Sequence, residues 1–132
     1  MTGHVGSRIH SSVPTFLVSD VGATARWYVR RLGFEFGGTF PKTEPYAYAS
    51  IHIGQAEIMF LNLDGYEKPD LSAQRPTGLW DAYIRMDGVR PMFQRVQHEP
   101  FIQSPLQRRP YGDWEFEVRD PNGYVLVFGG AP

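Results

Sequence analysis

The side chains that could carry chemistry in this chain are four histidines and its carboxylates. The chain has no cysteine, which excludes disulfides, thiolate metal sites and a cysteine nucleophile. His4 and His10 precede the first strand-like segment, whereas His52 lies beside a hairpin and His98 ends a helical segment. We interpret all four as surface or capping residues. Neither a glycine-rich phosphate loop nor an activated-serine motif occurs in the sequence.

Composition and charge narrow the possible functions. The 132 residues suit one domain, and a hydrophobic content of 42% is enough for a packed core. Thirteen Lys and Arg residues against 14 Asp and Glu give a formal charge of -1, which disfavours a nucleic-acid partner. No apolar stretch has membrane-spanning length, and residues 1–12 lack the apolar region of a secretory signal. We therefore expect a cytoplasmic protein without a membrane partner.

The first half of the chain reads as a strand, a helix and three strands. Residues 13–19 are strand-like, and Asp20 is a suitable helix N-cap. Apolar residues then recur at helical spacing from Val21 to Leu32, and Gly33 is a natural helix stop. This pattern predicts one amphipathic helix of about three turns. Three strand-like segments follow at residues 34–40, 46–53 and 56–63.

The second half repeats this order after a segment of linker composition, residues 64–77. The pattern of residues 79–86 predicts a strand. Asp87 repeats the capping position of Asp20, and residues 89–96 have an apolar face at helical spacing. The two halves agree in register, because Asp20 and Asp87 lie 67 residues apart, as do Phe34 and Phe101, and Phe60 and Phe128 lie 68 apart. Three more strands are predicted at residues 101–106, 114–118 and 124–128.

These repeats predict an α+β fold of two βαβββ modules. We expect a flexible segment at residues 1–11 and a single domain at residues 12–132. Within that domain, the modules span residues 12–63 and 78–130 and are joined by the linker at 64–77. Two curved sheets of four strands each form a cup whose concave faces must meet a ligand, each other or a partner chain.

Several of these segments resemble a known superfamily. They are the Phe-Leu-Val-Ser-Asp run at residues 16–20, Ala-Arg-Trp-Tyr at 25–28, Leu-Gly-Phe at 32–34 and Asp-Pro-Asn-Gly at 120–123. The chain resembles the glyoxalase/bleomycin resistance protein/dioxygenase superfamily, the vicinal-oxygen-chelate fold. This resemblance covers nearly the whole domain, and it implies a cup-shaped fold and a homodimer, either domain-swapped or side by side.

Within that superfamily the chain is most similar to the bleomycin-resistance branch. The similar segments are Val13-Pro14, the Arg-Leu-Gly-Phe run at residues 31–34 and Pro-Tyr-Gly at 110–112. Members of this branch sequester a drug in crevices of a dimer and catalyse no reaction. The resemblance therefore implies a binder connected with antibiotic resistance. However, the drug-binding relatives are more acidic than this chain, so its charge of -1 disfavours bleomycin itself as the ligand.

Metal-dependent members of the superfamily hold a divalent cation with four inward-facing side chains. The corresponding positions here are Val13, Met59, Asp81 and Val127. Valine cannot coordinate a metal, and a thioether is a poor ligand for the usual cations. We therefore expect no metal and no cofactor. One alternative remains, because Glu57 shares a strand face with Met59 and could supply an oxygen near Asp81.

Strand alternation and the resemblance together predict a mostly apolar cup with a few polar anchors. Trp80, Tyr83, Tyr111 and Trp114 are candidates for stacking on a flat ligand. Asp81 either pairs with Arg85 or receives a cationic group of the ligand. By contrast, the arginines at 108–109 read as part of a charged, solvated loop. The predicted ligand-binding residues are Met59, Trp80, Asp81, Tyr83, Arg85, Tyr111 and Trp114.

Three functions are compatible with the sequence. We favour a metal-free homodimeric protein that binds a small, partly aromatic organic molecule, with no catalytic residue. The alternative is an enzyme of the same fold, a lyase, isomerase or ring-cleaving dioxygenase, whose metal ligands lie elsewhere or whose base is Asp81 or Glu57. The third is an interaction module in which large side chains fill the cup. Convergence of two or more carboxylate or imidazole groups on one point would favour the enzyme.

Overall fold

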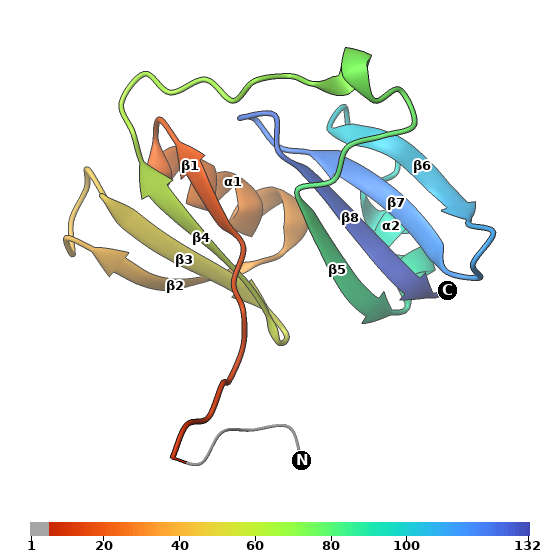
Figure 1. Ribbon diagram of the computed structural model, residues 1–132, viewed down its shortest axis with the longest axis horizontal. Coiled ribbons are helices and arrows are strands. Elements are labelled where there is room, and N and C mark those ends of the chain that lie inside the picture. Colours follow the sequence, from red (N-terminus) through yellow and green to blue (C-terminus); the bar gives the residue numbers. More distant parts are fainter. Residues whose placement is uncertain (1–5) are drawn as a thin grey trace.

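The computed structural model describes residues 6–132 and divides into two halves of similar construction (Figure 1). The first half comprises β1 (Thr15–Val18), α1 (Val21–Leu32), β2 (Glu35–Phe40), β3 (Tyr48–Ile53) and β4 (Ala56–Asn62). After a 3₁₀ turn, η1 (Ser72–Gln74), the second half comprises β5 (Ala82–Asp87), α2 (Val89–Val96), β6 (Ile102–Arg108), β7 (Trp114–Arg119) and β8 (Val125–Ala131). The predicted α+β fold of two βαβββ modules is confirmed. Of the predicted flexible segment, residues 1–5, including His4, lie outside the described residues.

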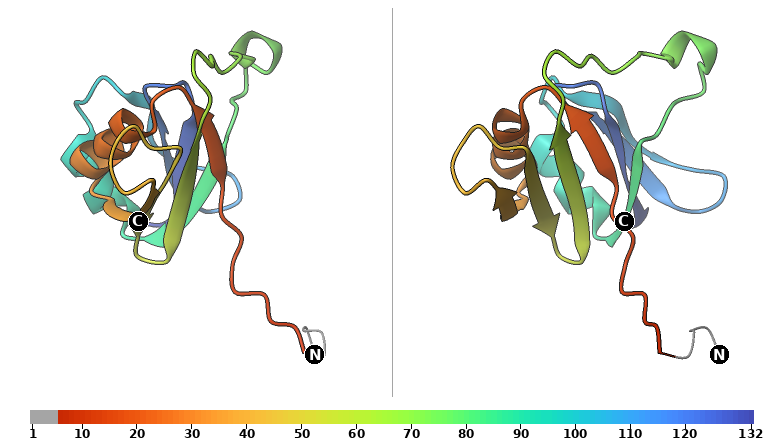
Figure 2. Two further views of the ribbon diagram at one scale, coloured as in Figure 1. Left: turned by 90° about the vertical axis from the view of Figure 1, so that its left-hand side faces the viewer. Right: turned by 60° about the vertical axis from the view of Figure 1, so that its left-hand side comes forward.

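Each half forms one four-stranded sheet, and the two sheets have the same strand order. The orders are β1-β4-β3-β2 and β5-β8-β7-β6. In each sheet the first strand pairs in parallel with the last, and the other pairs are antiparallel. Both helices lie on the same side of the molecule (Figure 2). Each sheet therefore has a face covered by its helix and a face turned away from it, here called the outer face.

Local signals explain where α1 begins and ends. The Asp20 carboxylate accepts a hydrogen bond from the Ala23 backbone N–H at 3.0 Å, as an N-cap does. Gly33 adopts the left-handed conformation (φ 80°) that ends the helix. Neither helix within residues 6–132 is long and apolar enough to cross a membrane.

The expected capping role of Asp87 in the second half is wrong. Asp87 is the last residue of β5, where it pairs with Ala131 of β8. The N-cap of α2 is Gly88, which has a φ of 72° and no side chain with which to cap the helix. Because β8 runs on to Ala131, it holds Asp87 in the sheet, and Gly88 supplies the turn into the helix.

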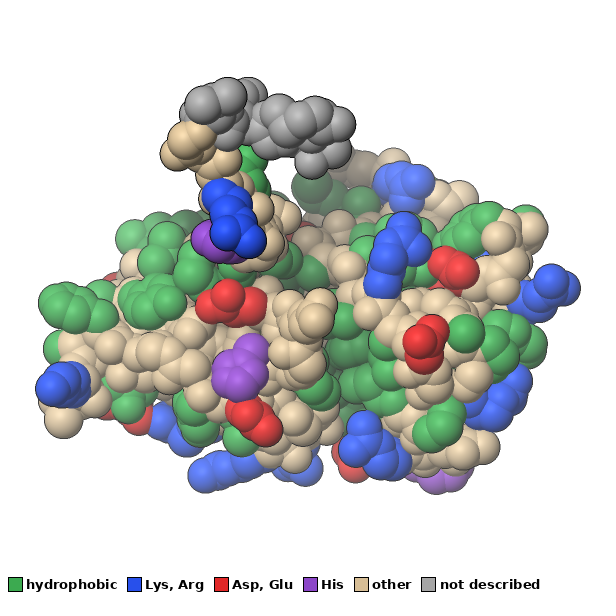
Figure 3. All heavy atoms as spheres, turned by 90° about the horizontal axis from the view of Figure 1, so that it is seen from below, with side chains coloured by type: hydrophobic (Ala, Val, Ile, Leu, Met, Phe, Trp, Pro, Cys, Tyr) green, Lys and Arg blue, Asp and Glu red, His purple; other side chains and the backbone are tan. Residues whose placement is uncertain are grey.

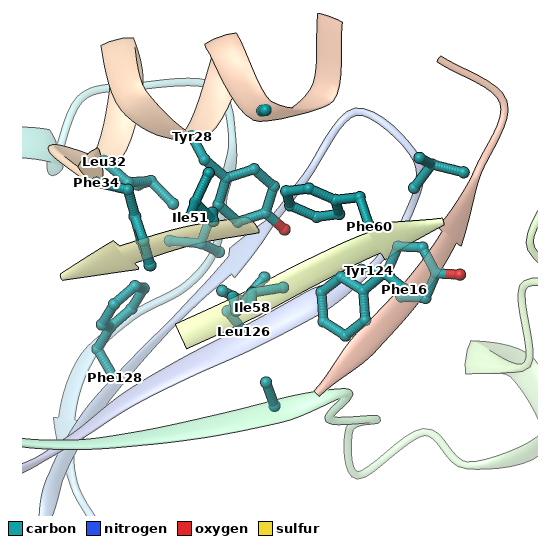
Figure 4. Close-up of a cluster of buried hydrophobic side chains, with 14 of the residues drawn as sticks. Phe16, Tyr28, Leu32, Phe34, Ile51, Ile58, Phe60, Tyr124, Leu126 and Phe128 are labelled. Carbon is teal, nitrogen blue, oxygen red and sulfur yellow. The ribbon is translucent and has the colours of Figure 1, made fainter. Parts of the chain in front are cut away.

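The helix-covered faces of both sheets share one hydrophobic core (Figure 4). Phe16 of β1 stacks on Tyr124, just before β8, with ring centroids 4.1 Å apart. Tyr28 of α1 donates a hydrogen bond of 2.6 Å to the buried Asp120, in the turn between β7 and β8. The halves are therefore joined through their helical sides, which leaves the outer faces free of this core.

Candidate functional site

The outer face of the second sheet carries two buried carboxylates. Glu115 and Glu117 alternate along β7 with core residues, and they are only 1% and 6% exposed. Strand pairing places Glu117 beside Val127 of β8, which in turn pairs with Tyr83 of β5. Side chains at directly opposed positions share one face of a sheet. These residues therefore lie side by side on the outer face.

Glu115 receives hydrogen bonds from three side chains. Its Oε2 accepts from the Tyr83 hydroxyl at 2.6 Å and also from the Tyr111 hydroxyl. Its Oε1 accepts from Arg109 Nε at 3.0 Å. Tyr83 reaches Glu115 across β8 because Gly129 lies between them. A Cβ at position 129 would stand 2.6 Å from Cζ of Tyr83 and 3.0 Å from Cγ of Glu115.

Glu117 anchors a tryptophan in a similar way. Its Oε2 accepts from Trp80 Nε1 at 3.2 Å and from Arg109 Nη2 at 3.4 Å, so that Arg109 links the two carboxylates. Trp80 remains 47% exposed, and Tyr111 61%. Their polar atoms are thus fixed at the sheet while much of each ring stays exposed to solvent. We call the connected residues the carboxylate network: Trp80, Tyr83, Arg109, Tyr111, Glu115 and Glu117.

The hydrogen bonds of the network set its protonation states. Burial alone would raise the pKa of Glu115, but hydrogen bonds from Tyr111, Tyr83 and Arg109 outweigh burial and hold that pKa below its ordinary value. Partial burial and the bond to Glu115 raise the pKa of Tyr111 to about 12, and that of Tyr83 is raised by the same causes. At neutral pH, Glu115 is therefore ionised and both phenols keep their protons.

Asp81 and Arg85 do not form the pair that the sequence left open. The Asp81 carboxylate accepts a hydrogen bond of 2.8 Å from the Val125 backbone N–H, and Lys68 Nζ lies 3.8 Å from it. The Arg85 guanidinium instead lies over the Tyr83 ring, 5.2 Å from its centroid, and 3.8 Å from Asp113. Four residues along an extended strand span about 13 Å, too far for a direct pair.

Two other predicted ligand-binding residues lie away from the network. Met59 is on the outer face of the first sheet, between Thr15 of β1 and Ser50 of β3. Trp114 lies one residue before Glu115 and so on the opposite, helix-covered face, where the Arg90 guanidinium sits 4.8 Å from its ring. The structure therefore brings together Trp80, Tyr83, Arg85 and Tyr111, but not Met59 or Trp114.

Three members of the network were not predicted from the sequence. Glu115 and Glu117 alternate with apolar residues in the predicted strand at 114–118, and this alternation was a usable sign of a polar face. Arg109 was expected in a solvated loop, yet its side chain is only 25% exposed. Its partners Glu115 and Glu117 lie six and eight residues further along the chain and come within its reach when the β6–β7 hairpin forms.

The four positions that correspond to the superfamily's metal ligands do not fit a divalent cation here. Val13 and Val127 offer only hydrocarbon, and the Asp81 carboxylate faces Lys68 and the backbone of β8. Across residues 6–132, no three His, Asp or Glu side chains converge as a metal site would require. The chemistry of this surface is that of aromatic rings and hydrogen bonds.

A cleft of about 550 Å³ separates the two halves on the side shown in Figure 3. It lies between the β3–β4 hairpin and β5, and Ile58, Ile84 and Phe128 give it apolar walls. Glu57 also lines the cleft, together with Tyr83 and Arg85. The cleft therefore extends from the hydrophobic core to one edge of the carboxylate network.

Comparison with known families gives one match that covers most of the chain. The model of the Glyoxalase/Bleomycin resistance protein/Dioxygenase superfamily matches residues 4–128. A search of curated proteins found no match.

Solved structures share the fold at low sequence identity. TioX from Micromonospora sp. ML1 is 23% identical with a TM-score of 0.69, covering 93% of this chain and 98% of its own. A second structure is the bleomycin-binding protein of the bleomycin-producing Streptomyces verticillus, solved with copper(II)-bleomycin. It is 19% identical with a TM-score of 0.66, and the match covers 96% of this chain and 98% of that protein. A glyoxalase-related enzyme from Clostridium phytofermentans is 13% identical with a TM-score of 0.74, covering 98% and 100%. At these identities the likeness establishes the fold alone.

Proposed function

Because the chain belongs to the glyoxalase/bleomycin resistance protein/dioxygenase superfamily, we propose that it is a non-catalytic binding protein of the bleomycin-resistance type. It takes a small, partly aromatic organic molecule, such as an antibiotic, onto the outer face of the second sheet. Binding needs neither metal nor cofactor. The protein acts as a homodimer, and its cytoplasmic location stays a prediction.

The observation that carries this proposal is the pair of exposed rings fixed at their polar ends. Trp80 is held by Glu117 and Tyr111 by Glu115, and both carboxylates are buried. A ring that is already fixed loses little conformational entropy when a ligand stacks on it. Each such contact is worth about 0.5–1.5 kcal/mol beyond the burial of area. The surface is therefore organised for stacking before any ligand arrives.

The same hydrogen bonds favour binding over catalysis. A general base needs an available lone pair and a pKa close to the working pH. The Glu115 carboxylate already accepts three hydrogen bonds, and its pKa is lowered. Asp81, one of the two bases considered for the enzyme alternative beside Glu57, is bound to the backbone of β8. Both carboxylates therefore act as anchors in this proposal.

The outer face of the first sheet supports a homodimer. Leu17 and Tyr48 flank Leu61 there, and Met59 and Thr15 occupy the next row. Leu61 is 43% exposed. This apolar strip lies beside Glu57 and His52 on the same face. It is suited to cover the same region of a second copy or to close over its stacked ligand. The bleomycin-binding protein solved with its drug shows that this fold can hold such a molecule.

Fluorescence titration in the presence of EDTA tests the proposal. The probes are proflavine, a flat tricyclic cation, and bleomycin. We expect at least proflavine to bind saturably, and Trp80→Ala to weaken its binding about threefold to tenfold, as loss of one stacked ring would. Trp27→Phe is the control, because Trp27 packs against Tyr28 and Phe101, away from the network. Failure of proflavine to bind saturably, or equal affinity for it in Trp80→Ala, contradicts the proposal.

A further inference from the structure

Hydrogen-bond direction within the carboxylate network determines what the two tyrosines can offer a ligand. A phenol has one proton to donate and lone pairs with which to accept. An ionised carboxylate can only accept. Both the Tyr83 and the Tyr111 hydroxyl therefore point their protons at Oε2 of Glu115. With both protons committed, the two phenol oxygens can only accept hydrogen bonds from a ligand.

Most polar groups next to the phenols have the same polarity, and the exception is the exposed Arg85 guanidinium over the Tyr83 ring. The Asp113 carboxylate is a second acceptor for Tyr83, with Oδ2 3.1 Å from its hydroxyl. Trp80 is a donor, but its N–H is used on Glu117, and Nε and Nη2 of Arg109 are used on the two buried carboxylates. The strongest donors of the network thus face inward, and acceptor oxygens and aromatic faces remain for the ligand.

We propose that Glu115 is a positioning residue that makes this face selective for flat ligands carrying N–H or O–H donors. This inference rests on the proposed function. Glu115 does not touch the ligand; it acts through the hydroxyls of Tyr83 and Tyr111. A glutamine at this position can donate as well as accept, so the Tyr111 hydroxyl can accept from it and turn its own proton outward, whereas Tyr83 keeps Asp113 as an acceptor. The preference for donor-bearing ligands then falls.

Two dyes of one shape test this selectivity. Proflavine and acridine orange share the flat acridinium ring and its charge, but the exocyclic nitrogens of proflavine carry hydrogens and those of acridine orange carry methyl groups. We expect the wild-type protein to bind proflavine about threefold to tenfold more tightly, the range expected for one additional hydrogen bond. The Glu115→Gln variant should bring this ratio close to one. A merely steric effect of the methyl groups would leave the ratio unchanged.

A second readout needs no ligand. In protein labelled at tyrosine Cζ with ¹³C, NMR titration reports the pKa of each phenol, and Tyr111→Phe identifies the Tyr111 signal. Glu115→Gln should lower the pKa of Tyr111 from about 12 toward its ordinary value, since the charged acceptor is gone. Tyr111→Phe should also reduce the dye ratio while leaving Glu115 in place, and Tyr66→Phe in the linker should not change it.

The outcomes separate this inference from the proposed function. If both dyes bind and Glu115→Gln leaves their affinity ratio unchanged, the positioning role is wrong and the binding function stands. If neither dye binds the wild-type protein, the proposed function fails and the selectivity fails with it. An unchanged Tyr111 pKa in a folded Glu115→Gln variant overturns the positioning role whatever the dyes do.

Discussion

Asp120 shows how one buried carboxylate can join two modules. Its Oδ2 accepts the Tyr28 hydroxyl, and its Oδ1 accepts the backbone N–H groups of Asn122 and Tyr124 at 2.8 and 2.9 Å. The two backbone hydrogen bonds shape the turn between β7 and β8, and the hydrogen bond from Tyr28 connects that turn to α1. Burial nevertheless outweighs these hydrogen bonds and raises the pKa of Asp120. The ionised form is thus held at a cost in stability.

This raised pKa predicts the sign of a pH effect. Unfolded chains lose the Asp120 proton near the ordinary value of 3.8, whereas the folded protein keeps it to higher pH. The contribution of Asp120 to the free energy of unfolding is therefore fully present below pH 3.8 and is lost as the pH rises through the folded pKa. In urea titrations, the stability of wild type minus that of Asp120→Asn should fall with rising pH. A flat or rising difference contradicts the expectation.

Asp70 supplies the control for this measurement. The hydrogen bonds from Ser72 lower the pKa of the exposed Asp70 carboxylate. Its contribution has the opposite sign, because it is present above the ordinary aspartate pKa and is lost as the pH falls. The difference in stability between wild type and Asp70→Asn should therefore rise weakly with pH.

At the scale of elements, the packing of side chains across β8 depends on one glycine of that strand. Gly129 lets the Tyr83 ring cross the strand to Glu115, and an added Cβ would collide with that ring. We expect Gly129→Ala to lower the free energy of unfolding by about 1–3 kcal/mol, the usual cost of overpacking, and to weaken proflavine binding. Urea denaturation measures the first effect and fluorescence titration the second.

Gly38 of β2 is the matched control, because it lies in a strand and the nearest atom to its added Cβ is Tyr48 Cε1 at 4.0 Å. Gly38→Ala should change stability much less than Gly129→Ala does. Replacing Tyr83 by alanine in the Gly129→Ala background removes the obstructed ring. This added substitution should therefore lower the free energy of unfolding little further. Equal losses in the two glycine variants would contradict the role given to Gly129.

Local patterns predicted most of the elements, and the exception shows their limit. Asp20 was predicted to cap α1 because the strand, the cap and the helical spacing are all encoded within a few residues. The same pattern at Asp87 led to a wrong cap. Its state is decided by pairing with Ala131, which lies 44 residues further along the chain. A strand that continues through long-range pairing cannot be recognised from a local window.

The candidate site divides along the same line. Tyr111 was expected to have a ligand role from its motif and Tyr83 from strand alternation, and both lie in the carboxylate network. The role of Arg109 depends on Glu115 and Glu117 of β7 lying within its reach, which the geometry of the β6–β7 hairpin brings about. Arg109, which was expected to be solvated, is partly buried because the fold supplies it with two opposite charges.

For the whole molecule, the shared core fixes the halves together and leaves the outer faces to be covered from outside. Homodimerisation through the first sheet predicts a particle of about twice the chain mass of 15.0 kDa in analytical ultracentrifugation. Leu61→Glu places a charge on the outer face of β4 and should shift the protein toward monomer, because a buried, unpaired carboxylate is costly.

Leu71→Glu provides a control of matched chemistry. Leu71 is 45% exposed, close to the 43% of Leu61, but it lies in the linker before η1. The Leu71→Glu substitution should leave the particle mass in ultracentrifugation and the affinity for proflavine unchanged. If the first sheet of a second copy closes over the ligand, Leu61→Glu should weaken proflavine binding as it dissociates the dimer, and binding should recover with rising protein concentration. A wild-type monomer, or a Leu61→Glu dimer of unaltered stability, would show that this face is not the dimer contact.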